Sequence, residues 1–170
     1  MLIEFSQLPP DARVWIFAAE RPLTEGEQRL LLSAVDSFLD SWKAHGEPLS
    51  ASRDLRYGQF LFVAVDESTA GASGCSIDAM VRVLSDLERQ LGLSLTDHGP
   101  VLYRRGSQVE RVSRPDFARL VREGVVSSDT IVFDNTLTRL ADVQAGRWEV
   151  PARDSWHARA FLSRPVAAHS

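Results

Sequence analysis

The chain has 170 residues, of which 44% are hydrophobic and 25% charged, an ordinary globular composition that excludes a disordered or low-complexity chain. This length corresponds to one domain or two small ones. With 19 basic and 23 acidic residues, the net charge of -4 argues against whole-surface binding to nucleic acid or acidic membranes but permits a local patch.

The first predicted elements are a strand and a helix. Residues 13–19 are rich in β-branched and aromatic side chains, which indicates a buried strand. Thr24 and Glu27 have the spacing of a capping box, so we expect a helix to begin there and to end at Gly46. Its predicted inner face consists of Leu31, Val35, Phe38 and Trp42.

A hairpin and a second helix follow. Residues 50–56 alternate as an edge strand, Tyr57-Gly58 predicts a turn, and residues 59–65 form the most hydrophobic strand. After a loop, a helix ends at Gly92. Its predicted apolar face is Ile77, Val81, Leu84, Leu87 and Leu91, and its outer face carries Asp78, Arg82 and Asp86.

A second hairpin, 101–104 with 109–112, gives a strand-helix-strand-strand-helix-strand order. This order predicts a ferredoxin-like α+β core over residues 1–112. A doubly wound parallel sheet is disfavoured, because a tight turn joins the central strands.

The remaining residues predict a C-terminal subdomain, 113–163, packed on that core, and a flexible tail, 164–170. Ser113 caps a helix with Pro115 in its first turn, and Gly124 ends it. The predicted elements that follow are a strand at 130–133, a helix at 137–145, an extended segment at 148–151 and a short helix at 155–161.

The loop 66–78 is the leading candidate site, because a long Gly/Ser-rich loop before a helix exposes backbone N–H groups that attract anions. We expect an anionic small molecule or phosphate group to be its ligand. The predicted ligand-binding residues are Ser68, Gly71, Ser73, Gly74, Ser76, Asp78 and Arg82. The alternative is structural: Ser73 or Ser76 caps the helix and the glycines form turns.

Cys75 lies at the expected start of that helix, where the dipole favours a thiolate nucleophile; burial as a small apolar side chain is the alternative. Asp66 and Glu67 are the candidate catalytic partners for proton transfer. As the single cysteine, Cys75 excludes an internal disulfide and a multi-cysteine zinc site, and no other spacing indicates a metal or cofactor. Whether the protein is an enzyme stays open. His157 and Asn135 would complete a thiol triad only if the fold brought them to Cys75.

Seven strings resemble a family of small uncharacterised bacterial proteins, common in Bacteroidota, that often carry the label "ABC transporter ATPase". They are WIF at 15–17, WKAHG at 42–46, AVDE at 64–67, AGASGCSID at 70–78, TIVFDN at 130–135, WEVPA at 148–152 and SWH at 155–157. The label implies a phosphate loop ending in Lys-Ser or Lys-Thr. The only lysine, Lys43, is followed by Ala44, which excludes a transporter ATPase.

Residues 116–133 resemble GYF-like modules, most of which bind peptides or proteins. This resemblance implies an alternative function, a non-enzymatic interaction module in which Phe133, Trp148 and Trp156 receive a protein partner. Six arginines between Arg104 and Arg122 form a strip that favours at most a local contact with nucleic acid or an acidic partner. No window has the roughly 20 apolar residues of a membrane helix, so we expect no membrane partner. The N-terminus has no secretory pattern, which predicts a cytoplasmic protein.

Overall fold

The computed structural model describes residues 1–68 and 70–162, which divide into two compact units. The first unit comprises residues 1–98 and 135–144, and the second comprises 99–134 together with the chain from 145 onward. The division therefore falls before the hairpin at 101–112 and not after it, because Val101 and Tyr103 belong to the same buried cluster as Phe117. The expected tail, 164–170, lies outside the described residues.

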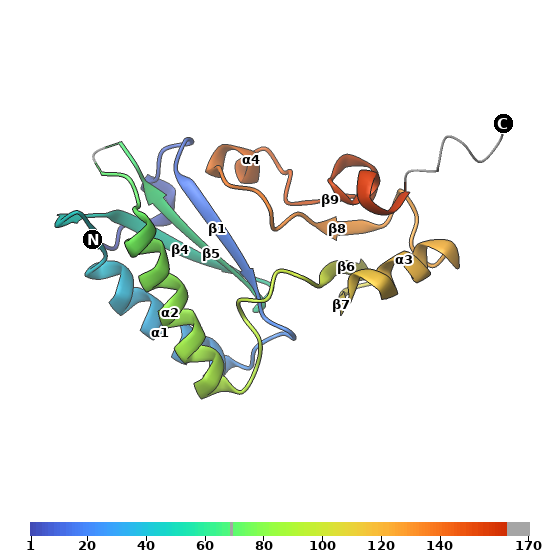
Figure 1. Cartoon of the computed structure of the whole chain (residues 1–170), viewed down its shortest axis with the longest axis horizontal. Coiled ribbons are helices and arrows are strands. Elements are labelled where there is room, and N and C mark those ends of the chain that lie inside the picture. The colour runs from blue at the N-terminus through green and yellow to red at the C-terminus, as the bar shows by residue number, and fades with distance from the viewer. Residues whose placement is uncertain (69, 163–170) are drawn as a thin grey trace. The chain divides into compact units, whose positions relative to one another are not determined.

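The first unit is built on a three-stranded antiparallel sheet of order β1-β5-β4 (Figure 1). The strands are β1 (Arg13–Ala18), β4 (Ser50–Arg56) and β5 (Phe60–Asp66). Trp15 and Arg53 both lie opposite Val63 in the central strand. Tyr57 and Gly58, with φ of 56° and 60°, form the predicted turn between β4 and β5. The predicted strands and hairpin are confirmed.

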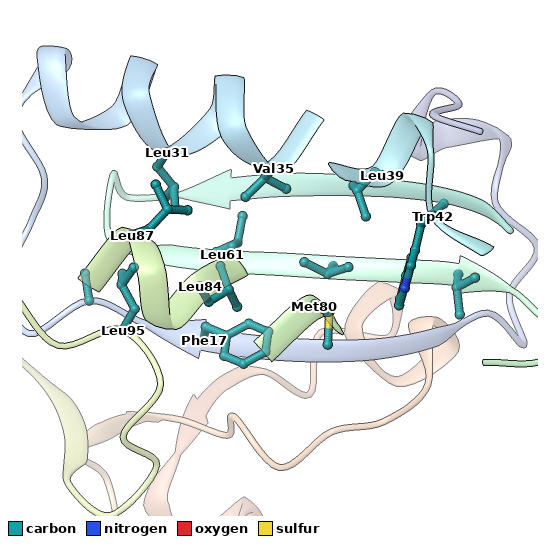
Figure 2. Packing of buried hydrophobic residues seen from close by; sticks show 14 of the residues in the cluster. Phe17, Leu31, Val35, Leu39, Trp42, Leu61, Met80, Leu84, Leu87 and Leu95 are labelled. Carbon is teal, nitrogen blue, oxygen red and sulfur yellow. The ribbon is translucent and has the colours of Figure 1, made fainter. Parts of the chain in front are cut away.

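Helices α1 (Glu25–Asp40) and α2 (Gly74–Leu91) lie side by side and cover one face of this sheet (Figure 1). Figure 2 shows the core between the helices and the sheet. Its labelled residues include Leu31, Val35 and Leu39 from α1, Met80, Leu84 and Leu87 from α2, and Phe17 and Leu61 from the sheet. The predicted face of α2 is wrong at Val81, which is 37% exposed, because Met80 points inward in its place.

The predicted capping box at the start of α1 is confirmed. The Glu27 N–H donates to Thr24 Oγ1 over 3.2 Å, and the Thr24 N–H donates to Glu27 Oε1 over 2.9 Å. The Arg21 guanidinium, together with the Thr24 N–H, lowers the pKa of Glu27 to about 2. The first turn of α1 is thereby fixed by charge as well as by backbone geometry.

The predicted end of α1 at Gly46 is wrong. The helix ends at Asp40, and a small hairpin of β2 (Lys43–Ala44) and β3 (Glu47–Pro48) follows. His45 and Gly46, with φ of 53° and 79°, form its turn, so the glycine serves a hairpin and not a helix terminus. Trp42 is buried, as its spacing predicts, but it lies beyond the helix, where its Nε1 donates to the Ser76 carbonyl over 2.9 Å.

The mixed α+β class is confirmed, but the ferredoxin-like sheet is not formed. The order β1-β5-β4 matches three strands of that arrangement. The expected fourth strand, β6 (Val101–Arg105), instead pairs with β7 (Gln108–Val112) and β8 (Ile131–Phe133) in the second unit. With β9 (Glu149–Pro151) they form a sheet of order β7-β6-β8-β9.

The core of the second unit is centred on Phe117 of α3 (Arg114–Arg122). Its ring packs edge-to-face on Tyr103 at 5.7 Å and on Phe161 at 4.9 Å. Ser113 caps α3 as predicted, through its hydroxyl and the Asp116 N–H. The predicted C-terminal helix is replaced by a 3-10 turn at Ala152–Asp154 and a π-helical turn at Ala158–Leu162. No described helix is long and apolar enough to cross a membrane.

Segment 135–144 contains α4 (Leu140–Gln144) and belongs to the first unit. The Leu140 N–H donates to the Ala12 carbonyl over 2.9 Å, and the Val14 N–H donates to the Thr138 carbonyl over 2.9 Å. An isolated antiparallel bridge joins Arg13 to Arg139. The segment therefore lies along the outer edge of β1.

Candidate functional site

The start of the loop 66–78 is held by its own carboxylates. Asp66 Oδ1 accepts a hydrogen bond of 2.9 Å from the Ser68 N–H, and Glu67 Oε2 accepts one of 3.0 Å from the Ala72 N–H. Both predicted catalytic acids therefore shape the loop. Thr69 of this loop lies outside the described residues.

The two serines at the start of α2 are used by the helix itself. Ser73 is the N-cap, and its hydroxyl accepts from the Ser76 N–H over 3.1 Å. Ser76 Oγ accepts from the Ser73 N–H over 2.7 Å and lies 2.8 Å from the Ser73 carbonyl. The capping alternative is thus seen, and the hydroxyls of Ser73 and Ser76 already have partners.

The glycines of the loop are not required by backbone conformation. Neither Gly71 nor Gly74 has a positive φ. A Cβ at Gly71 would lie 3.3 Å from Glu67 Oε2, whereas one at Gly74 would meet nothing within 4 Å. Gly74 therefore leaves the first turn of α2 open.

The structure does not gather the predicted catalytic residues into one cluster. Cys75 is exposed, so the alternative of a buried cysteine is wrong. Among the described residues, no group of three or more His, Cys, Asp and Glu side chains is placed to hold a metal ion. Asp78 and Arg82 are exposed on the outer face of α2, as predicted. His157 belongs to the second unit and is buried there.

A polar hollow of about 360 Å³ lies at the edge of β1 and is lined by Asp11, Arg13, Glu67, Thr138 and Arg139. The strand register explains this gathering. Arg13 lies opposite Val65 in β5, which places it near the start of the loop that carries Glu67. The bridge between Arg13 and Arg139 adds the second arginine. We call this site the β1-edge hollow.

The two arginines of the β1-edge hollow lie opposite one another across a backbone bridge. Like charges directly opposite across an antiparallel bridge repel. Neither guanidinium has an ion pair within the part of the chain that the structure describes, although Asp11 and Glu67 line the same hollow. The Arg13 guanidinium lies over the Trp15 ring, 4.7 Å from its centroid. Two guanidinium groups in one hollow are donors that suit a phosphate or carboxylate group.

Arg13 and Arg139 are not recognisable from the sequence as a pair. Arg13 begins a strand and resembles an ordinary flanking charge, while Arg139 lies far along the chain in a segment predicted to belong to the other subdomain. Their pairing depends on the return of segment 135–144 to the first unit. No local motif carries that information.

The residues implied by the GYF-like resemblance are buried or half-buried. Phe133 and Trp148 are only 2% and 3% exposed and pack against each other at 5.0 Å. Trp156 is half-buried between His157, stacked at 4.0 Å, and the Arg114 guanidinium at 4.9 Å. In this structure a peptide therefore has access to at most part of Trp156.

Two arginines of the predicted strip, Arg104 to Arg122, form ion pairs with described residues of the chain. Arg104 Nε lies 2.7 Å from Glu149 Oε2. Arg119 is placed between Asp116 and Glu123, at 3.6 Å and 3.2 Å. These pairs reduce the positive charge that the strip offers to a nucleic acid or an acidic partner.

Comparisons of the chain with protein-family models, with curated proteins and with solved structures found no match. Both resemblances noted in the sequence therefore stay predictions. Function is inferred from the geometry of the β1-edge hollow and its loop.

Proposed function

We propose that the protein binds an anionic small molecule in the β1-edge hollow, beside the loop 66–78. The phosphate or carboxylate group of this ligand lies between Arg13 and Arg139. The observation that carries the proposal is that a backbone bridge joins two arginines that line the same hollow and have no ion-pair partner among the described residues. A bound anion converts their mutual repulsion into two charge-assisted interactions.

In this proposal fewer residues of the loop contact the ligand than the sequence predicts. Glu67 lines the hollow, whereas Ser73 and Ser76 serve the helix cap. Asp11, Glu67 and Thr138 present oxygen atoms, which suit the hydroxyl or amino groups of the same ligand. The proposal covers binding alone, because no observation joins Cys75 to the hollow.

The test is titration with inorganic phosphate, pyrophosphate and citrate, followed by thermal unfolding and by amide NMR shifts. We expect at least one of these anions to raise the melting temperature and to shift the Arg13 and Arg139 signals. Arg139→Gln should weaken binding about tenfold or more, since it removes one charge-assisted contact. The matched control is Arg29→Gln, which removes an exposed arginine from α1.

Two further variants separate the hollow from the loop. Cys75→Ala should bind as the wild type does. Gly74→Val should also bind normally if the arginines carry the anion, and a loss of binding restricted to Gly74→Val would instead assign it to the amides of α2. Absence of any shift with all three anions up to about 10 mM would reject anion binding.

A further inference from the structure

The outer edge of β4 carries backbone groups that the sheet leaves unpaired. Among the strands of the described chain, β4 pairs with β5 alone, on its inner side. At Ala51 the N–H donates to the Met1 carbonyl over 3.0 Å and the carbonyl accepts from the Ile3 N–H over 2.9 Å, so this residue directs its backbone groups outward. Alternation along a strand makes Arg53 and Leu55 do the same. Within the described chain, nothing is hydrogen-bonded to the outward backbone groups of these two residues.

The N-terminal segment covers this edge at one position and then leaves it. Leu2 forms a parallel bridge with Ala51, and the chain turns into a 3-10 helix at Phe5–Gln7. A hollow of about 530 Å³ lies beyond the bridge, lined by residues 2–5 and 7, by Asp36 and by Ser52, Arg53 and Asp54. We call it the β4-edge hollow. The two open positions match an extended segment of about four residues at roughly 3.3 Å per residue.

The charges around the β4-edge hollow favour a basic occupant. Its lining holds three carboxylates, Glu4, Asp36 and Asp54, and one arginine, Arg53. Arg53 is bound to Asp36 by two hydrogen bonds of 2.7 and 2.9 Å, and Asp54 pairs with Arg56 at 3.0 Å. Glu4 is exposed and has no ion pair within the described residues.

Ser52 also belongs to this lining. The residue is 4% exposed, and its hydroxyl is not among the fully buried side-chain atoms of the described chain that lack a partner. An occupant that fits this edge therefore supplies backbone N–H and C=O groups and a positive charge. These requirements describe an extended peptide that contains lysine or arginine.

We propose that β4 accepts an extended segment of another protein as an additional strand, with a lysine or arginine of that segment directed at Glu4. Main-chain hydrogen bonds to Arg53 and Leu55 provide the affinity, and the acidic lining selects the basic side chain. The charged side chains of β4 discourage pairing with apolar strands, which is how natural edge strands avoid aggregation. This edge is the opposite edge of the sheet from β1, so the inference is independent of anion binding.

The first test uses a fluorescein-labelled, end-blocked heptapeptide of alternating threonine and valine with a central lysine. We expect saturable binding by fluorescence anisotropy, and about tenfold weaker binding of the same peptide with a central glutamate. The Arg53 and Leu55 amides should become protected from hydrogen exchange when the lysine peptide binds. Equal binding of both peptides, or binding without this protection, would overturn the proposal.

Variants of Leu55 test the backbone contact directly. Leu55→Pro removes an outward N–H while leaving the ladder with β5 intact, whereas Leu55→Ala keeps that N–H and shortens the side chain. The lysine peptide should bind Leu55→Ala as it binds the wild type. Its affinity for Leu55→Pro should be lower by a factor of about ten or more. Circular dichroism of both variants verifies that each is folded. Equal affinity in the two variants would contradict strand addition.

A second pair of variants needs no change in the backbone. Glu4→Gln should remove the preference for the lysine peptide, and Glu47→Gln, an exposed glutamate in β3, should leave it unchanged. Analytical ultracentrifugation tests whether a second copy of this chain occupies the edge of β4. A concentration-dependent dimer that is lost in Leu55→Pro and kept in Leu55→Ala would assign the edge to a second copy of this chain and reject the peptide.

Discussion

At the residue scale, His157 shows how burial sets the charge of a side chain in the second unit. It is 1% exposed, its Nδ1 contacts Ser155 Oγ, and it packs on Phe117 at 5.9 Å. Burial lowers the pKa of His157 to about 4; the Asp134 carboxylate opposes this shift and the Arg114 guanidinium adds to it. The folded protein therefore keeps this ring neutral at pH values where the unfolded chain binds a proton.

This difference predicts an acid-sensitive stability. Between the ordinary pKa of 6.5 and about 4, the unfolded state binds more protons, so the free energy of unfolding falls as the pH falls through that window. We expect His157 to account for about 2 kcal/mol of this loss. The measurement is urea unfolding at several pH values. The His157→Gln variant is the reference, because its pH dependence contains the contribution of the carboxylates without that of His157. Identical pH slopes in the two proteins would contradict the prediction.

Trp42 provides a second residue-scale prediction. Its indole Nε1 donates to the buried Ser76 carbonyl, and its ring packs edge-to-face on Trp15 at 5.9 Å. Trp42→Phe should destabilise the protein by about 1–3 kcal/mol, because it leaves that carbonyl without its partner. Trp15→Phe is the control, since the Trp15 indole donates to no described residue. Equal losses in chemical denaturation would show that the hydrogen bond is unimportant.

At the element scale, most helices and strands were predicted correctly, because caps and turns are determined by residues that are neighbours in the sequence. The capping boxes, the turn at Tyr57-Gly58 and the stop at Gly92 each depend on neighbouring residues. The prediction that α1 ends at Gly46 was wrong, because a glycine after a helical pattern can equally form a hairpin turn. In the site, the capping role of Ser73 was visible from spacing, whereas the pairing of Arg13 with Arg139 depends on contacts between distant segments.

Two glycines give a matched element-scale test. Gly58 has φ +60°, and a Cβ there would lie 2.7 Å from Gln28 Nε2, so Gly58→Ala should cost about 1–2 kcal/mol. Gly74 lies in the first turn of α2 with open space around it, so Gly74→Ala should be neutral or stabilising by about 0.5 kcal/mol. Thermal unfolding of both variants measures the difference. A loss in Gly74→Ala equal to that in Gly58→Ala would contradict this assignment.

At the scale of the whole molecule, the chain crosses between the two units three times, after His98, after Asp134 and after Gln144. The sequence could not reveal this, because α4 and its neighbours have the composition of any short surface helix. Leu140 is fully buried in the first unit, although most residues near it in sequence belong to the second.

This return predicts that mutations in segment 135–144 weaken the first unit. Leu140→Ala should cost about 2–4 kcal/mol by leaving a cavity, whereas the half-buried Leu137→Ala should cost less. Amide exchange should locate the loss in β1, α1 and α2. If protection fell only in the second unit, segment 135–144 would belong there.

The return of segment 135–144 also has a consequence for protein synthesis. During synthesis residues 1–98 emerge from the ribosome before segment 135–144, so the outer edge of β1 stays uncovered until residue 144 has been translated. The second unit's helix α3 and strand β8 are made during that delay. Arg139 belongs to the same segment, so a nascent chain has only one arginine of the pair until residue 139 has been translated. A chain truncated before residue 139 never acquires the second. The proposed anion site therefore forms only after segment 135–144 has been made, and a product shortened before this segment would have a first unit without that site.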